Sequence, residues 1–232
     1  MGSSPTRGTN TISVQKLSNK DFKWTPDLAY VVGLITTDGN LSKDNRHITM
    51  TSSDIEQIKT FKKCLNLSNK IGNTSPSRWS KKPCYRIQFG NIQFYQWLLK
   101  IGLSPAKSHI IGVIEIPDKY FRDFLRGHLD GDGSVYTYID TYNTFKNPKY
   151  IYNRLYVKFN SISKIHIEWL KQKIEKISQI KGNLLKPSNN QVVWTLRFPK
   201  KKSIKLLSWI YYDPNIPCLS RKKEIAKNFI DT

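Results

Sequence analysis

The stretch VVGLITTDG at residues 31–39 has a counterpart, LRGHLDGDG, at residues 125–133. Each stretch places a glycine inside an apolar helical run and ends in an Asp-Gly pair. Because the two copies fall in separate halves of a chain of 232 residues, they predict two related half-domains. Glycine inside a helix costs about 1 kcal/mol relative to alanine, so Gly33 and Gly127 require a structural reason.

Small residues follow one helical face in both copies. They occur at positions 29, 33 and 37 in the first copy and at positions 127 and 131 in the second. Stripes of small residues let two helix backbones approach closely. We therefore expect the two motif helices to pack against each other, to form the interface between the halves, and to end side by side.

The second copy offers two acidic residues, Asp130 and Asp132. The repeat aligns Asp132 with Asp38 and aligns Asp130 with Thr36. Residues two apart on a helix point about 200° apart, so Asp130 and Asp132 cannot both face one site. The alignment predicts that Asp38 and Asp132 form the acidic pair.

Two carboxylates at adjacent helix C-termini are unfavourable by themselves, because the helix dipole is negative there and like charges repel. Carboxylates grouped with helix-terminal carbonyls suit a hard divalent cation, so we expect Mg²⁺ there, with Mn²⁺ or Ca²⁺ able to take its place. Next to DNA, such a cation would activate water and stabilise the leaving 3′-oxygen. A simple turn after each helix is the alternative interpretation, and the duplication in a basic chain argues against it.

The charge of the chain indicates a polyanionic partner. Thirty-eight Lys and Arg stand against seventeen Asp and Glu, which gives a net charge of +21. Residues 1–116 carry 16 basic and 7 acidic residues (+9), and residues 117–232 carry 22 and 10 (+12). A basic surface that continues across both halves is typical of a protein that binds nucleic acid. A general RNA-binding protein fits the charge equally well, but it does not explain the doubled Asp-Gly.

Composition also restricts the protein class. With 38% hydrophobic residues and six Trp, the chain can bury a core and is not a disordered basic arm. It contains no apolar run of 18 residues, so we expect no membrane span. Its three cysteines match neither a zinc spacing nor a disulfide framework. This favours an intracellular, reducing compartment, without distinguishing cytoplasm, organelle matrix or nucleoid.

Capping and periodicity predict the same order of elements in each half. Thr25 and Pro26 begin the first motif helix, and Ser53–Glu56 is a capping box for the next helix. The expected first-half elements are strands at 46–51 and 85–89 and helices at about 53–65 and 91–100. The expected second-half elements are helices at about 118–129, 164–178 and 201–211, and strands at 134–140, 154–161, 183–186 and 191–198.

The predicted fold class is therefore α+β, with two pseudo-symmetric α-β-β-α-β-β-α half-domains. The expected domains are an N-terminal extension at 1–24, a first half-domain at 25–112, a linker at 113–117 and a second half-domain at 118–232. The Tyr-rich hairpin around 140–153 lengthens the second half and indicates an asymmetric reach along DNA.

One face of each predicted sheet is polar and basic where the other is apolar, as alternation along a strand requires. We expect these faces to contact DNA. The candidate residues are Asn40, Ser42, Arg46, Arg78, Lys81, Arg86 and Gln88 in the first half, and Tyr136, Tyr138, Asp140, Arg154, Lys158, Lys186, Asn190 and Arg197 in the second. A strand of about ten residues spans roughly one turn of DNA, so two halves would read about 20 base pairs as a monomer.

The doubled phrase resembles the motif of the LAGLIDADG homing endonucleases, in the single-chain form with two copies. The resemblance extends from about Thr25 to Lys223. It implies paired antiparallel sheets that form a DNA-binding saddle, with the two motif helices at the centre. It also implies site-specific, Mg²⁺-dependent cleavage of both DNA strands with 3′ overhangs, in the homing of an intron or a similar element.

The resemblance also implies roles for particular residues. The metal ligands would be Asp38 and Asp132, helped by the backbone carbonyls of Thr37 and Gly131. Basic residues near the scissile phosphates match Lys107 and Lys223, with Lys222 as an alternative to Lys223. Ser53 and Ser163 match polar positions near the site, and helix capping explains them equally well.

The sequence departs from the family motif at two places, and two other functions are alternatives to a LAGLIDADG endonuclease. Thr36-Thr37 replaces the Asp-Ala of the family name, and Arg126 places a charge on a helix expected to be buried, where it faces outward or pairs with an acid. An intron maturase or a DNA-binding regulator on the same scaffold is the main alternative, and the presence of both aspartates favours catalysis. A His-Asn-His nuclease is disfavoured because the four histidines lack ligand spacing.

Overall fold

Helix α1 (Pro26–Thr37) contains the first copy of the motif, as predicted. The Thr25 side chain caps it by accepting a hydrogen bond from the Leu28 N–H at 3.1 Å, and Pro26 occupies the first turn. The helix ends at Asp38, whose N–H donates to the Leu34 carbonyl. The structure, a computed structural model, describes residues 22–74, 84–105, 110–187 and 192–230.

The first half continues with one sheet and two further helices. Its elements are β1 (Gly39–Leu41), β2 (His47–Ser52), α2 (Ile55–Cys64), β3 (Gly72–Thr74), β4 (Cys84–Gly90) and α3 (Ile92–Lys100). The strands form an antiparallel sheet in the order β1-β2-β4-β3. This is the predicted α-β-β-α-β-β-α order.

The second half repeats this plan on a larger scale. Its elements are a 3-10 helix η2 (Asp118–Tyr120), α4 (Phe121–Asp130), β5 (Ser134–Asp140), β6 (Tyr152–Ser161), α5 (Lys164–Ser178), β7 (Asn183–Leu185), β8 (Trp194–Phe198), α6 (Lys200–Ile210) and α7 (Ser220–Ile230). The antiparallel strand order, β5-β6-β8-β7, matches that of the first sheet. The α+β fold class with two related halves is thus confirmed.

Helix α7 is an element that the predicted order lacked. The segment 219–224 was expected to follow the last helix of its half, but it forms the beginning of α7. The N-terminus of α7 crosses to the first half, where the Ser220 N–H donates to the Glu56 carboxylate at 3.0 Å and Arg221 Nε donates to Asp54 at 3.1 Å. The last helix therefore connects the two halves.

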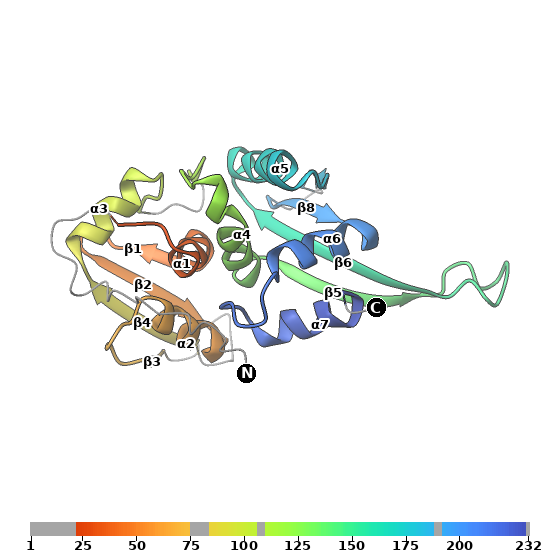
Figure 1. Cartoon of the computed structure of the whole chain (residues 1–232), viewed down its shortest axis with the longest axis horizontal. Coiled ribbons are helices and arrows are strands. Elements are labelled where there is room, and N and C mark those ends of the chain that lie inside the picture. Colours follow the sequence, from red (N-terminus) through yellow and green to blue (C-terminus); the bar gives the residue numbers. More distant parts are fainter. Residues whose placement is uncertain (1–21, 75–83, 106–109, 188–191, 231–232) are drawn as a thin grey trace, which may run out of the picture.

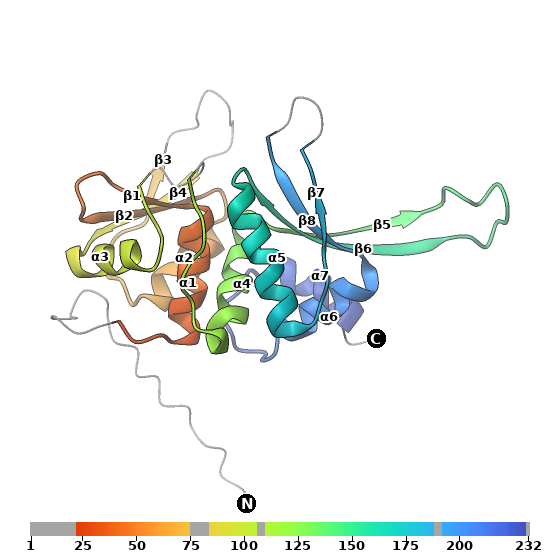
Figure 2. The ribbon, with the colours of Figure 1, turned by 90° about the horizontal axis from the view of Figure 1, so that it is seen from above.

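The motif helices lie at the centre of the molecule. Figure 1 shows α1 and α4 side by side, with one sheet on either side of the pair. Every residue of α1 from Leu28 to Thr36 is buried. Figure 2 shows the helices gathered on one side of the sheets, which leaves the other side open. None of the helices within the described ranges is long and apolar enough to cross a membrane.

Alternation along the strands places the apolar side chains on the helix side. In the first sheet Ile48, Met50 and Ile87 are buried there, and in the second sheet Val157 and Phe159 take the same role. Full burial of such a side chain contributes about 1.5–3 kcal/mol. The inner rows of both sheets therefore hold the helix layer in place.

The structure corrects the predicted start of α2 and identifies the partner of Arg126. The N-cap of α2 is Asp54, which accepts from the Glu56 N–H at 3.0 Å, so the predicted capping box was placed one residue too early at Ser53. Of the two outcomes expected for Arg126, facing outward or pairing with an acid, the structure shows the second. Arg126 is fully buried, contacts Asp123 at 2.8 Å and donates to the carbonyls of residues 210 and 217.

Candidate active site

The two motif helices touch through their backbones at the predicted glycines. A methyl group added to Gly127 would lie 2.0 Å from the Tyr30 carbonyl oxygen, and one added to Gly33 would lie 2.2 Å from the Phe124 carbonyl oxygen. Real side chains do not reach such distances. Helix contact therefore explains both glycines, and the predicted interface between the halves is confirmed.

The same interface brings the ends of the helices together. A methyl group on Gly131 would lie 1.9 Å from the Thr37 hydroxyl oxygen and 2.9 Å from a carboxylate oxygen of Asp38. The end of the first motif thus contacts the backbone that immediately precedes Asp132. Asp38 is half-buried and Asp132 is exposed. Asp132 borders a cavity of about 300 Å³ that Thr37 also lines.

Asp130 and Asp132 occupy different environments, as helix geometry predicted. Asp130 is buried and its Oδ2 accepts hydrogen bonds from the Tyr30 hydroxyl at 2.9 Å and the Leu219 N–H at 2.8 Å. Burial raises the pKa of Asp130 to about 6, although the nearby Lys222 ammonium opposes this shift. Asp130 therefore belongs to the core, and Asp132 belongs to the surface.

The polar faces of both sheets point away from the helices. In the first sheet Asn40, Arg86 and Gln88 share the open face, because their strand neighbours face the core. In the second sheet register aligns Lys158 with Arg197 on this face. The same face carries Tyr136, Tyr138, Asp140 and Arg154.

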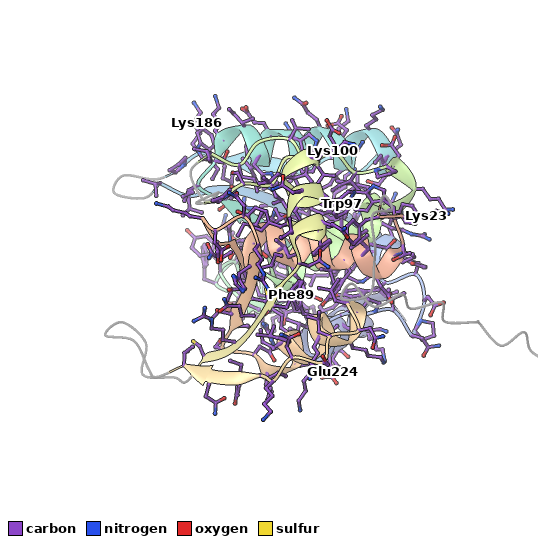
Figure 3. All side chains as sticks on the ribbon, turned by 90° about the vertical axis from the view of Figure 1, so that its left-hand side faces the viewer. Lys23, Phe89, Trp97, Lys100, Lys186 and Glu224 are labelled. Atoms are coloured by element: carbon purple, nitrogen blue, oxygen red, sulfur yellow. The ribbon has the colours of Figure 1, made fainter. Side chains whose placement is uncertain are left out.

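The remaining candidates for DNA contact lie beside these faces or outside the described residues. Ser42 and Arg46 flank the turn between β1 and β2, and Lys186 directly follows β7. Figure 3 shows Lys186 and Lys23 on opposite sides of the molecule. Arg78, Lys81 and Asn190 lie outside the described residues.

Comparison with known proteins agrees with this arrangement. No protein-family model matches the sequence, and no curated protein matches it. Several solved structures share the arrangement at a TM-score above 0.5, and three of them represent the set. Full-length DUF199/WhiA from Thermatoga maritima has a TM-score of 0.55 and 17% identity, over 92% of this chain and 62% of that protein. The chain thus spans less than two thirds of WhiA.

The other two structures are homing endonucleases. I-LtrWI, a LAGLIDADG homing endonuclease bound to target DNA, has a TM-score of 0.55 and 12% identity, over 88% of each chain. I-DmoI in complex with DNA and Mn has a TM-score of 0.51 and 15% identity, over 81% of this chain and 97% of that one. The chain has the LAGLIDADG fold.

In the first LAGLIDADG half, Gln57 is a residue of the site that was not predicted from the sequence. This residue is 3% exposed and lies one turn into α2. Its Nε2 donates to Asp38 Oδ2 at 2.8 Å, and its Oε1 accepts from the Ser52 hydroxyl at 2.6 Å. The amide therefore fixes the orientation of the Asp38 carboxylate. The shared spacing of Ser52 and Gln57 with Ser161 and His166 was the signal that could have found it.

In the second LAGLIDADG half, His166 takes the position of Gln57, because each lies three residues after its helix N-cap. Ser163 is that N-cap and accepts from the His166 N–H at 3.3 Å. His166 Nε2 lies 3.1 Å from Nε2 of His128 on α4, and its Nδ1 lies 2.8 Å from the Gly112 carbonyl. The two imidazoles stack with centroids 5.3 Å apart. The two LAGLIDADG halves therefore differ next to their aspartates.

The predicted basic residues differ in their distance from the ends of the LAGLIDADG helices. Lys107 lies outside the described residues. Lys223 Nζ donates to the Pro214 carbonyl at 2.6 Å, beyond α6. Lys222, the alternative, is the lysine that reaches the end of α4. Its Nζ donates to the carbonyls of Leu129, of Asp130 at 3.0 Å and of Gly133 at 2.8 Å.

The environment of Lys222 suits a structural cation at the negative end of a helix. The side chain is 3% exposed, and burial lowers the pKa of Lys222 to about 8. An ammonium group has three N–H donors, and three carbonyls accept them. Lys222 therefore fixes the turn that carries Asp132 and has no further donor to offer.

The oxygen atoms at the two LAGLIDADG helix ends fit a hard divalent cation. Among the described residues, no three His, Cys, Asp or Glu side chains are grouped as a metal site. Mg²⁺ needs only one or two carboxylates, since it retains several waters. Asp38 and Asp132 would supply these, and the predicted Thr37 and Gly131 carbonyls are distinct from the three that accept hydrogen bonds from Lys222.

Proposed function

We propose that this protein is a site-specific DNA endonuclease that binds a long asymmetric duplex as a monomer and hydrolyses both strands. The observation that carries this proposal is the contact of Gly131 with Asp38, which brings the two Asp-Gly ends together beside two open, basic sheet faces. A binding protein would need the faces but not the paired carboxylates.

The surface supports duplex DNA as the substrate. The net charge of +21 is distributed over both halves, and phosphate neutralisation by Lys and Arg dominates DNA affinity. The solved LAGLIDADG relatives I-LtrWI and I-DmoI were both crystallised with DNA. Two sheets, each spanning roughly one helical turn, correspond to a site of about 20 base pairs.

The residues of the site support metal-dependent hydrolysis. Asp38 and Asp132, with the Thr37 and Gly131 carbonyls, would hold Mg²⁺, which supplies an activated water and stabilises the leaving 3′-oxygen. Gln57 holds the Asp38 carboxylate in one orientation, and Lys222 fixes the turn that carries Asp132. Lys107 and Lys223 remain our candidates for stabilising the charge that develops on the phosphates.

The test begins with a library of duplexes that carry a randomised centre. Duplexes bound in Ca²⁺ are recovered, and the selected site is then incubated with Mg²⁺. We expect cleavage of both strands with 3′ overhangs, mapped by end sequencing, and a 1:1 complex in sedimentation. Asp38→Asn and Asp132→Asn should each reduce double-strand cleavage at least ~1,000-fold and leave affinity within about three-fold.

Asp118→Asn provides the matched control, because it removes an exposed carboxylate that pairs with Lys173 and precedes the N-terminus of α4, whereas Asp132 follows the C-terminus of that helix. It should cleave at the rate of the unmodified protein. Full cleavage by an Asp38→Asn/Asp132→Asn double variant would overturn the assignment of the site. Specific binding without Mg²⁺-dependent cleavage would instead leave a DNA-binding protein on the same fold.

A further inference from the structure

The tip of the β5–β6 hairpin presents apolar side chains that no other element covers among the described residues. Figures 1 and 2 show this hairpin projecting well beyond the rest of the molecule. Tyr142 is 81% exposed and Phe145 is 75% exposed, and Ile139 and Ile151 are also exposed. Contiguous exposed apolar groups of this kind mark interaction surfaces.

The tip holds its aromatic side chains in a defined conformation. The Tyr142 N–H donates to the Asp140 carboxylate at 3.0 Å, the Thr144 hydroxyl donates to the Thr141 carbonyl at 2.8 Å, and the Lys149 N–H donates to the Asn147 side chain at 2.9 Å. The rings of Tyr142 and Phe145 meet edge to face, with centroids 6.4 Å apart. The aromatic pair is therefore supported by its own turn.

The charge of the tip is complementary to a polyanion. Lys146 and Lys149 lie in the turn, and Lys146 Nζ lies 5.5 Å from the centre of the Phe145 ring. The nearby acid, Asp140, is paired with Arg154 at 2.9 Å. A ring beside an ammonium group suits the backbone of duplex DNA, because the ring can pack on a deoxyribose while the ammonium contacts a phosphate.

The tip lies at the outer end of the open face of the second sheet. The rings of Tyr136 and Tyr138 both stack on Tyr156, at 5.5 and 6.1 Å. Lys158 lies 4.6 Å from the Tyr136 ring, and Arg197 lies 5.3 Å from the Tyr156 ring. Alternating aromatic and basic side chains therefore run from the centre of the molecule toward the tip, so one partner can contact both.

We propose that the hairpin tip binds the duplex DNA that flanks the site on the side of the second half-domain, with Tyr142 and Phe145 as its main contacts. The proposal rests on the proposed function. β6 has 10 residues and β2 has 6. The difference of four residues is about 13 Å, or roughly four base pairs, and the tip reaches further still. The second half therefore contacts a longer stretch of DNA than the first.

The test measures affinity in Ca²⁺ for the selected duplex after either flank is shortened by about six base pairs. We expect the unmodified protein to lose roughly ten-fold in affinity when one flank is removed and to change little when the other is removed. A Tyr142→Ser/Phe145→Ser variant should bind the full duplex as weakly as the unmodified protein binds the shortened one. It should show no further loss on the shortened duplex.

Ile165→Ser on α5 is the matched control, since it also removes an apolar side chain that is 66% exposed. It should retain the flank effect in full. The proposal is overturned if the tip variant keeps the ten-fold flank dependence, or if its hydroxyl-radical footprint is unchanged. It is also overturned if the variant loses affinity equally for both duplex lengths. Failure to select any duplex would count against the proposed function instead, so the two failures are distinguishable.

Discussion

The two halves of the molecule share a backbone plan but surround their aspartates differently. In the first half, Gln57 donates to Asp38 at 2.8 Å and the carboxylate is half-buried. In the second half, the matching residue, His166, turns to His128 at 3.1 Å, and Asp132 is exposed. The common part is the helix contact, which tolerates no side chain at its glycines. The surrounding polar groups are free of that constraint and have diverged.

This difference has a consequence for the proposed reaction. If each aspartate serves one DNA strand, their unequal surroundings predict unequal cleavage rates on the two strands. A change in a shared element should impair both strands together. A change beside one aspartate should impair one strand and leave a nicked intermediate.

The largest effect is expected at the element the halves share. Gly127→Ala places a methyl group 2.0 Å from the Tyr30 carbonyl oxygen, and backbone on both helices must shift to accommodate it. We expect the free energy of unfolding to fall by about 3 kcal/mol or more, measured by urea denaturation, with cleavage of both strands lost together. Gly72→Ala is the control, because the added methyl group would lie 3.9 Å from its nearest neighbour, the Arg86 carbonyl oxygen. Equal stability of the two variants would contradict the close helix contact.

The sequence could predict this shared element because its signals are local and repeated. The spacing of small residues marked the helix contact, and alignment of the two motifs separated Asp132 from Asp130. Alternation along the strands placed Lys158 and Arg197 on the open face. These inferences used either the period of a single helix or strand, which determines the face a residue occupies, or the alignment of two short stretches of sequence.

The surroundings of the aspartates depend on contacts between distant elements, which no local pattern reports. Gln57 reaches Asp38 from another helix, and Lys222 reaches the end of α4 from 89 or more positions along the chain. Alignment of the half-domain ends paired Lys107 with Lys223 and so favoured Lys223 over Lys222. The two lysines are adjacent in the sequence, and only the direction in which each side chain leaves the helix distinguishes them. Helix α7 determines that direction, and the described residues of the first half contain no counterpart to align with it.

An intermediate effect is expected at the lysine beside the second aspartate. Lys222→Met keeps a similar volume but removes three hydrogen bonds to the turn that carries Asp132. Changes in groups that orient metal ligands typically cost 10–100-fold, so we expect cleavage of one strand to fall by up to ~100-fold. Supercoiled plasmid carrying the selected site should then accumulate as a nicked circle. Lys227→Met, at an exposed lysine on the same helix α7, is the control and should change neither rate by more than about three-fold.

A merely structural role for Lys222 would have a different signature. Loss of global stability would reduce cleavage of both strands in proportion, and no nicked circle would accumulate. Selective nicking of one DNA strand therefore tests whether Lys222 positions the turn that carries Asp132. Equal rates on the two strands in Lys222→Met would contradict that role.

The smallest effect is expected at the glutamine beside the first aspartate. Gln57→Ala removes the hydrogen bond to Asp38 and leaves the carboxylate and its helix end in place, so we expect a roughly ten-fold loss on one strand, with binding unchanged. The DNA strand that is cleaved slowly should be the one that Lys222→Met cleaves normally. Denaturing gels with separately labelled strands would measure the two cleavage rates. Gln96→Ala, at an exposed glutamine on α3, controls for loss of an amide and should cleave normally.

The pair of variants decides whether the two halves act independently. If Gln57 and Lys222 each serve one aspartate, the strands that slow must differ, because Gln57 hydrogen-bonds Asp38 whereas Lys222 hydrogen-bonds the turn that carries Asp132. If both variants slow the same strand, or slow both equally, then Asp38 and Asp132 act as one shared centre. The difference in their surroundings would then reflect packing, and the division of labour between the halves would be wrong.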